Sequence, residues 1–334
     1  MKTLVNVKDL SVSYFTYAGE VQSVRGVSFD IESGKTTALV GESGCGKSVT
    51  SKALMGLIER PGVVKEGSQI FYEGKNILDF KEKEWLDFRG KECSMIFQDA
   101  LVSLNPTMMI GKQIMENLEN HNDEKLSKTE IRKRAQQMLE LVGIPKERGG
   151  EYPHQFSGGM KQRVVIAIAL ACQPDLLIAD EPTTALDVTI QAQVLEMMKE
   201  LKDRYGTSML MITHDLGIVA EICDEVSVIY AGHIVEHGTL EDVFDDTKHP
   251  YTRGLFNSLP NMEDRSARLK PIKGLMPDPS NLPEGCAFCP RCEYAMEICK
   301  HEKPCRVWKN DTHYVECHLY NTENITDKEV LKDE

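Results

Sequence analysis

A glycine-rich segment near the N-terminus contains the residue types that bind a nucleoside triphosphate. Residues 41–48 read Gly-Glu-Ser-Gly-Cys-Gly-Lys-Ser. They lie between an apolar run at residues 36–40, which predicts a buried strand, and a helical pattern at residues 52–58. In this context the glycines allow a tight turn whose N–H groups point at phosphates, and the helix N-terminus favours negative charge. We therefore expect nucleotide contacts from Gly41, Ser43, Gly44, Cys45, Gly46, Lys47, Ser48 and Val49.

The chemistry of this phosphate loop, residues 41–48, needs a metal ion and a base. Lys47 is predicted to reach the β- and γ-phosphates, and the Ser48 hydroxyl to ligate Mg²⁺. A second apolar run ends in Asp180 and Glu181. We assign Asp180 to the Mg²⁺ and Glu181 to the attacking water. An acidic pair at a strand end is by itself more typical of a helix cap or a turn, so this assignment depends on the phosphate loop upstream.

Further motifs resemble those of the ATP-binding subunits of ABC transporters. Ser157, Gly158 and Gly159 look like the family signature, with Phe156 and Met160 in place of the usual Leu and Gln. Serine and glycine at a helix start offer hydroxyl and N–H donors to an anion. The remaining matches are Asp180 and Glu181 (Walker B), residues 185–187 with Asp187 (D-loop), His214 (switch histidine), Gln98 (Q-loop) and Tyr14 (adenine contact).

The resemblance implies roles for these residues. In the family, the signature contacts the γ-phosphate of ATP held by the opposite subunit, so ATP joins two subunits and hydrolysis releases them. His214 is expected to contact the γ-phosphate and the attacking water, and Gln98 to touch Mg²⁺ or water and report the nucleotide state. Tyr14 is expected to stack on adenine, although Phe15 and Tyr17 lie close by.

Three segments narrow the resemblance to the dipeptide/oligopeptide (peptide/nickel) importers: residues 152–163, 103–106 and 249–252. It implies an ATPase subunit that powers import of di- and oligopeptides through two membrane permease subunits, served indirectly by an extracytoplasmic peptide-binding protein. A nickel importer ATPase of the same family is an alternative. A soluble ABC ATPase of translation or repair is another, which the acidic charge disfavours.

Length and charge limit the possible partners. The chain has 334 residues and a net charge of −13, which argues against nucleic-acid binding. One phosphate loop and no internal repeat mean that a second ABC subunit, identical or different, must complete the sites. We find no apolar stretch long enough to span a bilayer and no signal peptide, and expect a peripheral protein at the cytoplasmic face of the membrane.

The expected fold class is α/β, with the RecA-like mixed sheet of the ABC-type P-loop ATPases. The resemblance adds an antiparallel β subdomain and a helical subdomain at about residues 105–165. We divide the chain into an ATPase domain at residues 1–240 and a small Cys-rich extension at residues 241–334.

Six of the ten cysteines lie between residues 286 and 317, and such a cluster in a cytosolic chain favours metal over disulfides. The spacing of Cys286, Cys289 and Cys292 is similar to a ferredoxin pattern, and either C-x₂-C pair equally starts a zinc site. In the importer family the C-terminal pattern corresponds to Cys286, Cys292, Cys299 and Cys317, with Cys289 and Cys305 as alternates. We expect a [4Fe–4S] cluster, with Zn²⁺ as the alternative and a structural or redox-sensing role open.

Overall fold

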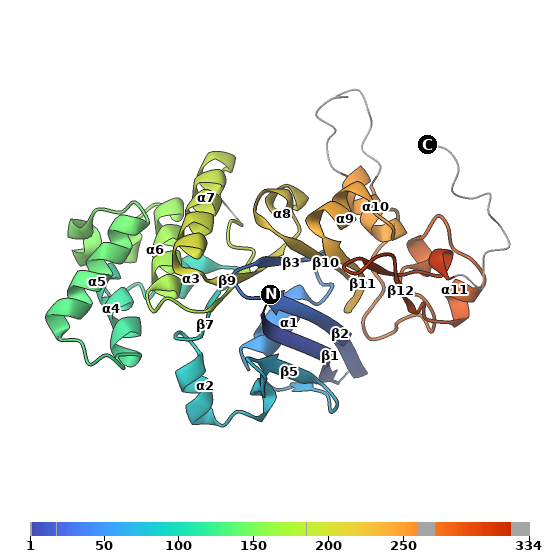
Figure 1. The fold of residues 1–334 in the computed structure, drawn as a ribbon, viewed down its shortest axis with the longest axis horizontal. Helices are drawn as coiled ribbons and strands as arrows, with labels where there is room; N and C mark the ends of the chain where they lie inside the picture. The colour runs from blue at the N-terminus through green and yellow to red at the C-terminus, as the bar shows by residue number, and fades with distance from the viewer. Residues whose placement is uncertain (1, 18, 185, 259–270, 322–334) are drawn as a thin grey trace.

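The computed structural model describes residues 2–17, 19–184, 186–258 and 271–321, which form two β-sheets with helices around them (Figure 1). The larger sheet has eight strands: β12 (Arg306–Trp308), β13 (Tyr314–Glu316), β11 (His233–Thr239), β10 (Glu225–Tyr230), β3 (Thr36–Val40), β9 (Ser208–Thr213), β8 (Leu176–Asp180) and β7 (Cys93–Ile96), in spatial order. The five strands from β10 to β7 are parallel, and β11, β13 and β12 add antiparallel pairs. This confirms the predicted mixed sheet.

The centre of the larger sheet is fully buried. All residues of β3, β8 and β9 are buried, as expected of parallel strands that are covered on both faces. The continuous apolar sequences of β3 and β8 are the reason that these two strands were predicted.

The smaller sheet is antiparallel and is formed mainly by the N-terminal residues. Its strands are β1 (Thr3–Thr16), β2 (Gly19–Glu32), β4 (Gly62–Val64), β5 (Gln69–Tyr72) and β6 (Lys75–Asn76). Figure 1 places β1, β2 and β5 below the larger sheet. The predicted antiparallel region at the N-terminus is therefore present.

Eleven α-helices are found in the described residues: α1 (Lys47–Leu54), α2 (Glu82–Phe88), α3 (Ala100–Ser103), α4 (Ile110–Asn120), α5 (Lys128–Leu141), α6 (Gly158–Leu170), α7 (Val188–Tyr205), α8 (Leu216–Ile222), α9 (Leu240–Asp245), α10 (Pro250–Asn257) and α11 (Ile298–His301). α4 and α5 gather at one end of the molecule, where a helical subdomain was expected (Figure 1). None of the helices described is both long and apolar enough to cross a membrane.

The first helix begins earlier than predicted. α1 starts at Lys47 rather than at residue 52, and it ends at Leu54. The helix begins there because Gly46, with φ of 106°, closes the phosphate loop in a left-handed conformation. Lys47 and Ser48 therefore belong to the first helical turn and not to the loop before it.

Residues 241–258 and 271–321 pack closely onto the preceding part of the chain. β13 pairs with β11, and the buried Glu236 of β11 accepts hydrogen bonds from the backbone N–H of His249 (3.0 Å) and from Lys248 (2.6 Å). Glu236 also lies 3.0 Å from the His313 ring.

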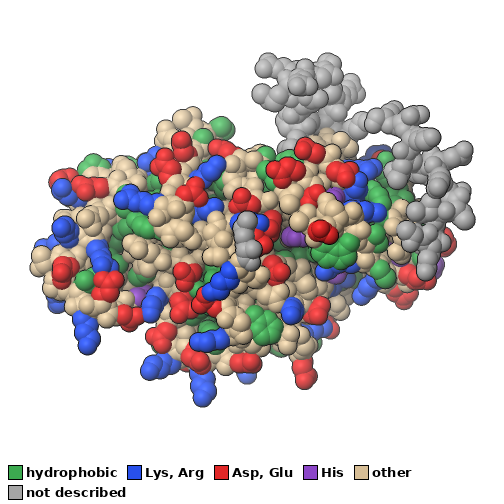
Figure 2. Space-filling model, in the orientation of Figure 1, with side chains coloured by type: hydrophobic (Ala, Val, Ile, Leu, Met, Phe, Trp, Pro, Cys, Tyr) green, Lys and Arg blue, Asp and Glu red, His purple; other side chains and the backbone are tan. Residues whose placement is uncertain are grey.

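On the face drawn in Figure 2, acidic and basic side chains are interspersed.

The buried His249 makes stability depend on pH. Burial lowers the pKa of His249 to about 4, against the attraction of Glu236 and Glu316. In the unfolded chain His249 is protonated below about pH 6.5, whereas in the folded chain it stays neutral down to about pH 4. Because the unfolded state binds the extra proton, the unfolding free energy decreases as the pH falls through this window. In the folded chain His249 Nδ1 accepts a hydrogen bond from the Tyr251 N–H at 3.0 Å. His249→Asn retains a side-chain acceptor at this position.

We expect His249→Asn to flatten the pH dependence of the unfolding free energy by about 1.4 kcal/mol per pH unit between pH 6 and 4.5. Denaturant unfolding at several pH values measures this slope. The exposed His154 provides the control, because His154→Asn leaves the slope unchanged. An unchanged slope in His249→Asn would show that this ring is not held neutral.

Candidate nucleotide site

The phosphate loop turns so tightly that two of its glycines cannot be replaced without displacing the backbone. A Cβ on Gly41 would lie 2.2 Å from the Ile229 carbonyl oxygen, and a Cβ on Gly46 would lie 2.4 Å from that of Ser23. The loop buries Cys45 and leaves Ser43 and Gly44 exposed, while Val49 is half-buried in the first turn of α1. The exposed side of the loop is thus open to phosphates.

Lys47 lies inside the curve of the loop. Its side chain is 5% exposed, and Nζ donates to the carbonyl oxygens of Gly41 at 2.7 Å and Glu42 at 2.9 Å. These contacts hold the ammonium at the centre of the turn. A phosphate oxygen can replace the carbonyl oxygens there as the hydrogen-bond acceptor of Lys47.

Two of the three predicted Mg²⁺ contacts, Ser48 and Asp180, are hydrogen-bonded to each other, whereas Gln98 bonds to Glu181. Ser48 Oγ donates to Asp180 Oδ1 at 3.0 Å, joining the start of α1 to the end of β8. Burial raises the pKa of Asp180, and the Ser48 hydrogen bond opposes part of this shift. A hydroxyl and a carboxylate are oxygen donors of the kind that Mg²⁺ takes alongside water and phosphate oxygens, so the pair fits the expected ion.

Glu181 is the centre of a hydrogen-bonded group. Its Oε2 accepts from Gln98 Nε2 at 3.1 Å and from Thr184 Oγ1 at 3.1 Å, and its Oε1 lies 3.1 Å from His214 Nδ1. The three predicted catalytic residues are therefore brought together. Thr184 was missed, because its only signal is a position three residues after Glu181.

Glu181 is held as a carboxylate in an unusual backbone conformation. Burial alone would raise its pKa, but the interaction with His214, the Thr184 hydrogen bond and the charge of Lys47 outweigh burial and lower the pKa. Its φ of 47° is rare for a residue with a side chain. This turn aims the carboxylate along the edge of the sheet, where a base for water is needed.

The proposed adenine contact lies on β1. The Tyr14 ring packs against Gly62, where a Cβ would lie 2.7 Å from Tyr14 Cε1. Burial raises the pKa of the Tyr14 phenol. The neighbouring Phe15 is 53% exposed and Tyr17 is fully exposed, so Tyr14 is the aromatic ring that is fixed by packing.

The signature residues form a separate hollow. Ser157 caps α6, its Oγ accepting from the Met160 N–H at 3.4 Å, and Asp187 caps α7 by accepting from the Ile190 N–H at 3.0 Å. The side chains between these caps line a hollow of about 560 Å³, and no phosphate-loop residue is among those lining it. Within one chain, the signature and the phosphate loop therefore do not form one site; Ala185 of the D-loop lies outside the described residues.

The two departures from the usual signature have a common physical explanation. The Arg148 guanidinium lies 4.5 Å from the centre of the Phe156 ring, and its Nη1 is 3.4 Å from Met160 Sδ. The same guanidinium pairs with Glu151 at 2.6 Å. Phe156 and Met160 thus supply an aromatic face and a soft acceptor to one fixed cation.

The C-terminal cysteines are gathered but are not arranged as metal ligands. Burial, followed by the proximity of Cys286, Cys292 and Cys299, raises the pKa of Cys317 to about 12. Among the described residues, however, no group of three or more His, Cys, Asp or Glu side chains is arranged to hold a metal ion. The structure therefore does not support the predicted [4Fe–4S] site as an assembled ligand set. Of the two alternates, Cys289 lies near this group and Cys305 is exposed.

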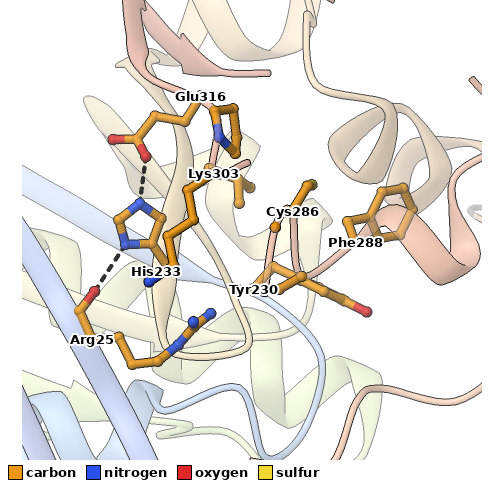
Figure 3. A pocket seen from close by; sticks show the side chains of 11 residues that line it. Arg25, Tyr230, His233, Cys286, Phe288, Lys303 and Glu316 are labelled. Atoms are coloured by element: carbon orange, nitrogen blue, oxygen red, sulfur yellow. Dashed lines mark hydrogen bonds and ion pairs between the residues drawn. The ribbon is translucent and has the colours of Figure 1, made fainter. Parts of the chain in front are cut away.

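A small cavity of about 120 Å³ lies beside Cys286 (Figure 3). His233 bridges it, with Nδ1 2.9 Å from the Arg25 carbonyl oxygen and Nε2 bonded to the Glu316 carboxylate. Tyr230 and Phe288 line the same cavity, which links the cysteine region to β10.

The sheet order and the loops at its edge define the ATP-binding cassette class of P-loop ATPases. A dimeric ATP-binding cassette bound to ADP and Pi covers 71% of this chain and 98% of its own length, with a TM-score of 0.64 and 24% identity, which shows the fold. CbiO1 from Clostridium perfringens, part of the CbiONQ ABC transporter complex, covers 74% of this chain and 92% of its own, at a TM-score of 0.63 and 27% identity.

Sequence comparison narrows the class. The family described as "ABC transporter" matches residues 24–184, and "Oligopeptide/dipeptide transporter, C-terminal region" matches residues 235–299. The oligopeptide transport ATP-binding protein OppD of Bacillus subtilis is 55% identical over 95% of this chain and 88% of its own length. The dipeptide transport ATP-binding protein DppD of the same organism is 50% identical over 96% and 95%. The chain belongs to the ATP-binding subunits of the oligopeptide/dipeptide ABC transporter family and is an ATPase of that class.

Glu181→Gln tests the assignment of the base. The amide cannot accept a proton from water, so we expect ATP to bind normally while hydrolysis falls by about 10²-fold or more. Nucleotide binding and phosphate release, measured on the same preparation, separate the two effects. Glu196→Gln, on the exposed side of α7, should hydrolyse ATP like the wild type. Wild-type hydrolysis by Glu181→Gln would show that another group acts as the base.

Proposed function

We propose that this chain is the ATP-hydrolysing subunit that powers import of di- and oligopeptides. The observation that carries the proposal is the convergence of Gln98, Glu181 and His214 beside the Ser48–Asp180 pair. Lys47 holds the triphosphate and Glu181 orients water onto the γ-phosphate. Ser48 and Asp180 would hold a Mg²⁺ ion that neutralises phosphate charge. The C-terminal match to the peptide-transporter family, and the names of the relatives, support peptides as the cargo and set aside the alternative of translation or repair.

We place a second ABC subunit opposite the first. No phosphate-loop residue lines the hollow formed by the signature residues. The serine and glycine donors of the signature therefore do not face the phosphate loop of their own chain. Two chains that meet face to face would let each Ser157 reach the γ-phosphate held by the other. ATP then joins the subunits, and hydrolysis releases them. An identical chain or a related one can fill this position.

The surface that meets the permease is proposed to lie beside the Q-loop. A hollow of about 480 Å³ lies between the strand before Gln98 and helices α4 and α6. Its lining includes Phe97, which is 41% exposed, together with Leu57 and Leu104. An amphipathic helix of a permease would cover the exposed Phe97 ring and the half-buried Leu57. This contact would hold the chain at the cytoplasmic face of the membrane.

Uptake of labelled peptides in cells that lack this chain tests the cargo. We expect the wild-type chain and Glu196→Gln to restore uptake of labelled di- and oligopeptides, and Glu181→Gln to fail. Nickel uptake is measured in the same cells. If the chain restores nickel uptake and has no effect on any peptide, the nickel alternative holds and the peptide proposal is wrong.

We also propose that Cys286, Cys292, Cys299 and Cys317 hold a [4Fe–4S] cluster in the proposed extension, residues 241–334. The Cys286 N–H donates to the Cys299 carbonyl oxygen at 2.8 Å, and backbone hydrogen bonds through Cys289 join Cys286 to Cys292, so these residues are close together. Thiolates are the ligands that iron–sulfur clusters and zinc require. The thiols must rotate toward a common centre to do so. When bound, such a cluster would fix the extension against the ATPase domain.

Metal analysis of protein purified without oxygen tests this second proposal. We expect a brown protein with about four irons per chain, which Cys292→Ser loses and the exposed Cys305→Ser keeps. A colourless protein with one zinc would replace the cluster by a structural zinc site. If neither iron nor zinc were found, the cysteines would be free thiols and the cofactor proposal would be wrong.

A further inference from the structure

Glu42, in the phosphate loop, is held at all three of its polar groups. Its carbonyl oxygen accepts from Lys47 Nζ at 2.9 Å. Its backbone N–H donates to Tyr251 Oη at 2.9 Å, and its carboxylate receives Arg291 Nη1 at 2.6 Å and Nη2 at 3.0 Å. Two of these three contacts come from residues beyond 240, and the third is with the lysine that binds phosphate.

Arg291 is itself held rigidly. Its side chain is 5% exposed, and its Nε donates to the Lys273 carbonyl oxygen at 3.0 Å. The guanidinium lies 5.8 Å from the centre of the Tyr230 ring, and Nη1 is 3.4 Å from Tyr230 Oη. The hydrogen bonds to Glu42 raise the pKa of Arg291. A two-point arginine–carboxylate pair whose arginine is buried fixes both distance and direction, which a lysine cannot do.

The position of this pair gives it a consequence for ATP. Glu42 adds a negative charge to a loop that must accept a triphosphate, and its side chain is 32% exposed. Unpaired, that carboxylate would repel the phosphates across a short distance and would compete for Lys47. The pair with Arg291 neutralises the charge and leaves Lys47 Nζ to the carbonyl oxygens of Gly41 and Glu42, with Cys45 Sγ 3.9 Å away in the same loop.

We propose that Arg291 is a positioning residue for ATP binding, which acts from the C-terminal extension through Glu42. It holds the first turn of the phosphate loop in the shape that presents Lys47, and it cancels the charge that would oppose the triphosphate. The inference rests on the proposed role of residues 41–48 as the phosphate site. Tyr251 assists by fixing the Glu42 peptide from the same side.

A charge-removal series tests the proposal. In the full-length chain, Arg291→Gln should weaken binding of a fluorescent ATP analogue about tenfold, because Glu42 is left unpaired. The double variant Glu42→Gln/Arg291→Gln should recover to within about threefold of the wild type, because the repelling charge is gone. Arg291→Lys, which keeps the charge without the two-point contact, should lie between them. The KM for ATP should rise more than kcat falls.

Two further variants make each outcome decisive. Lys47→Ala must lose binding; if it binds like the wild type, the proposed phosphate site fails. If Lys47→Ala loses binding while Arg291→Gln and Arg291→Lys bind normally, only the inference about Arg291 is overturned. Equal weakness of the single and double variants would also overturn it, because the effect would not come from the Glu42 charge. Lys273→Gln, exposed in the same segment, should bind like the wild type.

Discussion

The parallel register of four buried strands determines where the chemistry takes place. In the larger sheet, Val40 is level with Thr213, Asp180 with Ile212, and Ile96 with Ala179. The chain therefore leaves β3, β7, β8 and β9 at the same edge, and the segments that follow each strand meet there. The phosphate loop, Gln98, Glu181 and His214 are brought together because each comes directly after one of these strands. A shift of one residue in any strand would turn its side chains to the opposite face.

This edge contains charges and strain that a stable core would avoid. Asp180 is 2% exposed and Lys47 5%, so both have been removed from water, and Glu181 adopts a left-handed backbone conformation. Burial of a carboxylate is unfavourable, as the raised pKa of Asp180 shows. The carbonyl oxygens around Lys47 and the Ser48 hydroxyl offset part of this cost before any ligand is present. Mg²⁺ would supply positive charge to Asp180, and the phosphate oxygens would supply negative charge to Lys47, which would compensate the rest of this cost.

Residues beyond 240 pack against the phosphate loop through a group of aromatic rings. The rings of Tyr230 and Tyr251 lie 4.6 Å apart at their centres, and Phe288 packs against both at 5.2 and 5.4 Å. This aromatic group joins the two regions, because Phe288 lies in the segment that carries the cysteines and the Tyr251 hydroxyl reaches the phosphate loop. Residues of the proposed extension therefore pack directly against the phosphate loop.

The sequence by itself determined the features whose cause is local. Glycines at fixed spacing predicted the phosphate loop, and continuous apolar runs predicted β3 and β8. The acidic pair at the end of the second run predicted Glu181, and family motifs added Gln98 and His214. The structure brings these three side chains together. The start of α1 was placed five residues too late, because the left-handed Gly46 cannot be read from spacing alone.

Only the tertiary structure decided the contacts between distant residues. Glu42 and Arg291 are 249 positions apart, and a single charged pair at that separation leaves no periodic pattern in the chain. Arg148 lies only 12 positions before Met160, but its contacts with Met160 and the Phe156 ring likewise follow from the fold and not from residue spacing. The cysteine spacing predicted ligands for a metal, but the relative placement of the thiols depends on how β13 and the loops before it pack. Local conformation is encoded by neighbouring residues, whereas long-range pairing depends on which surfaces the folded core brings into contact.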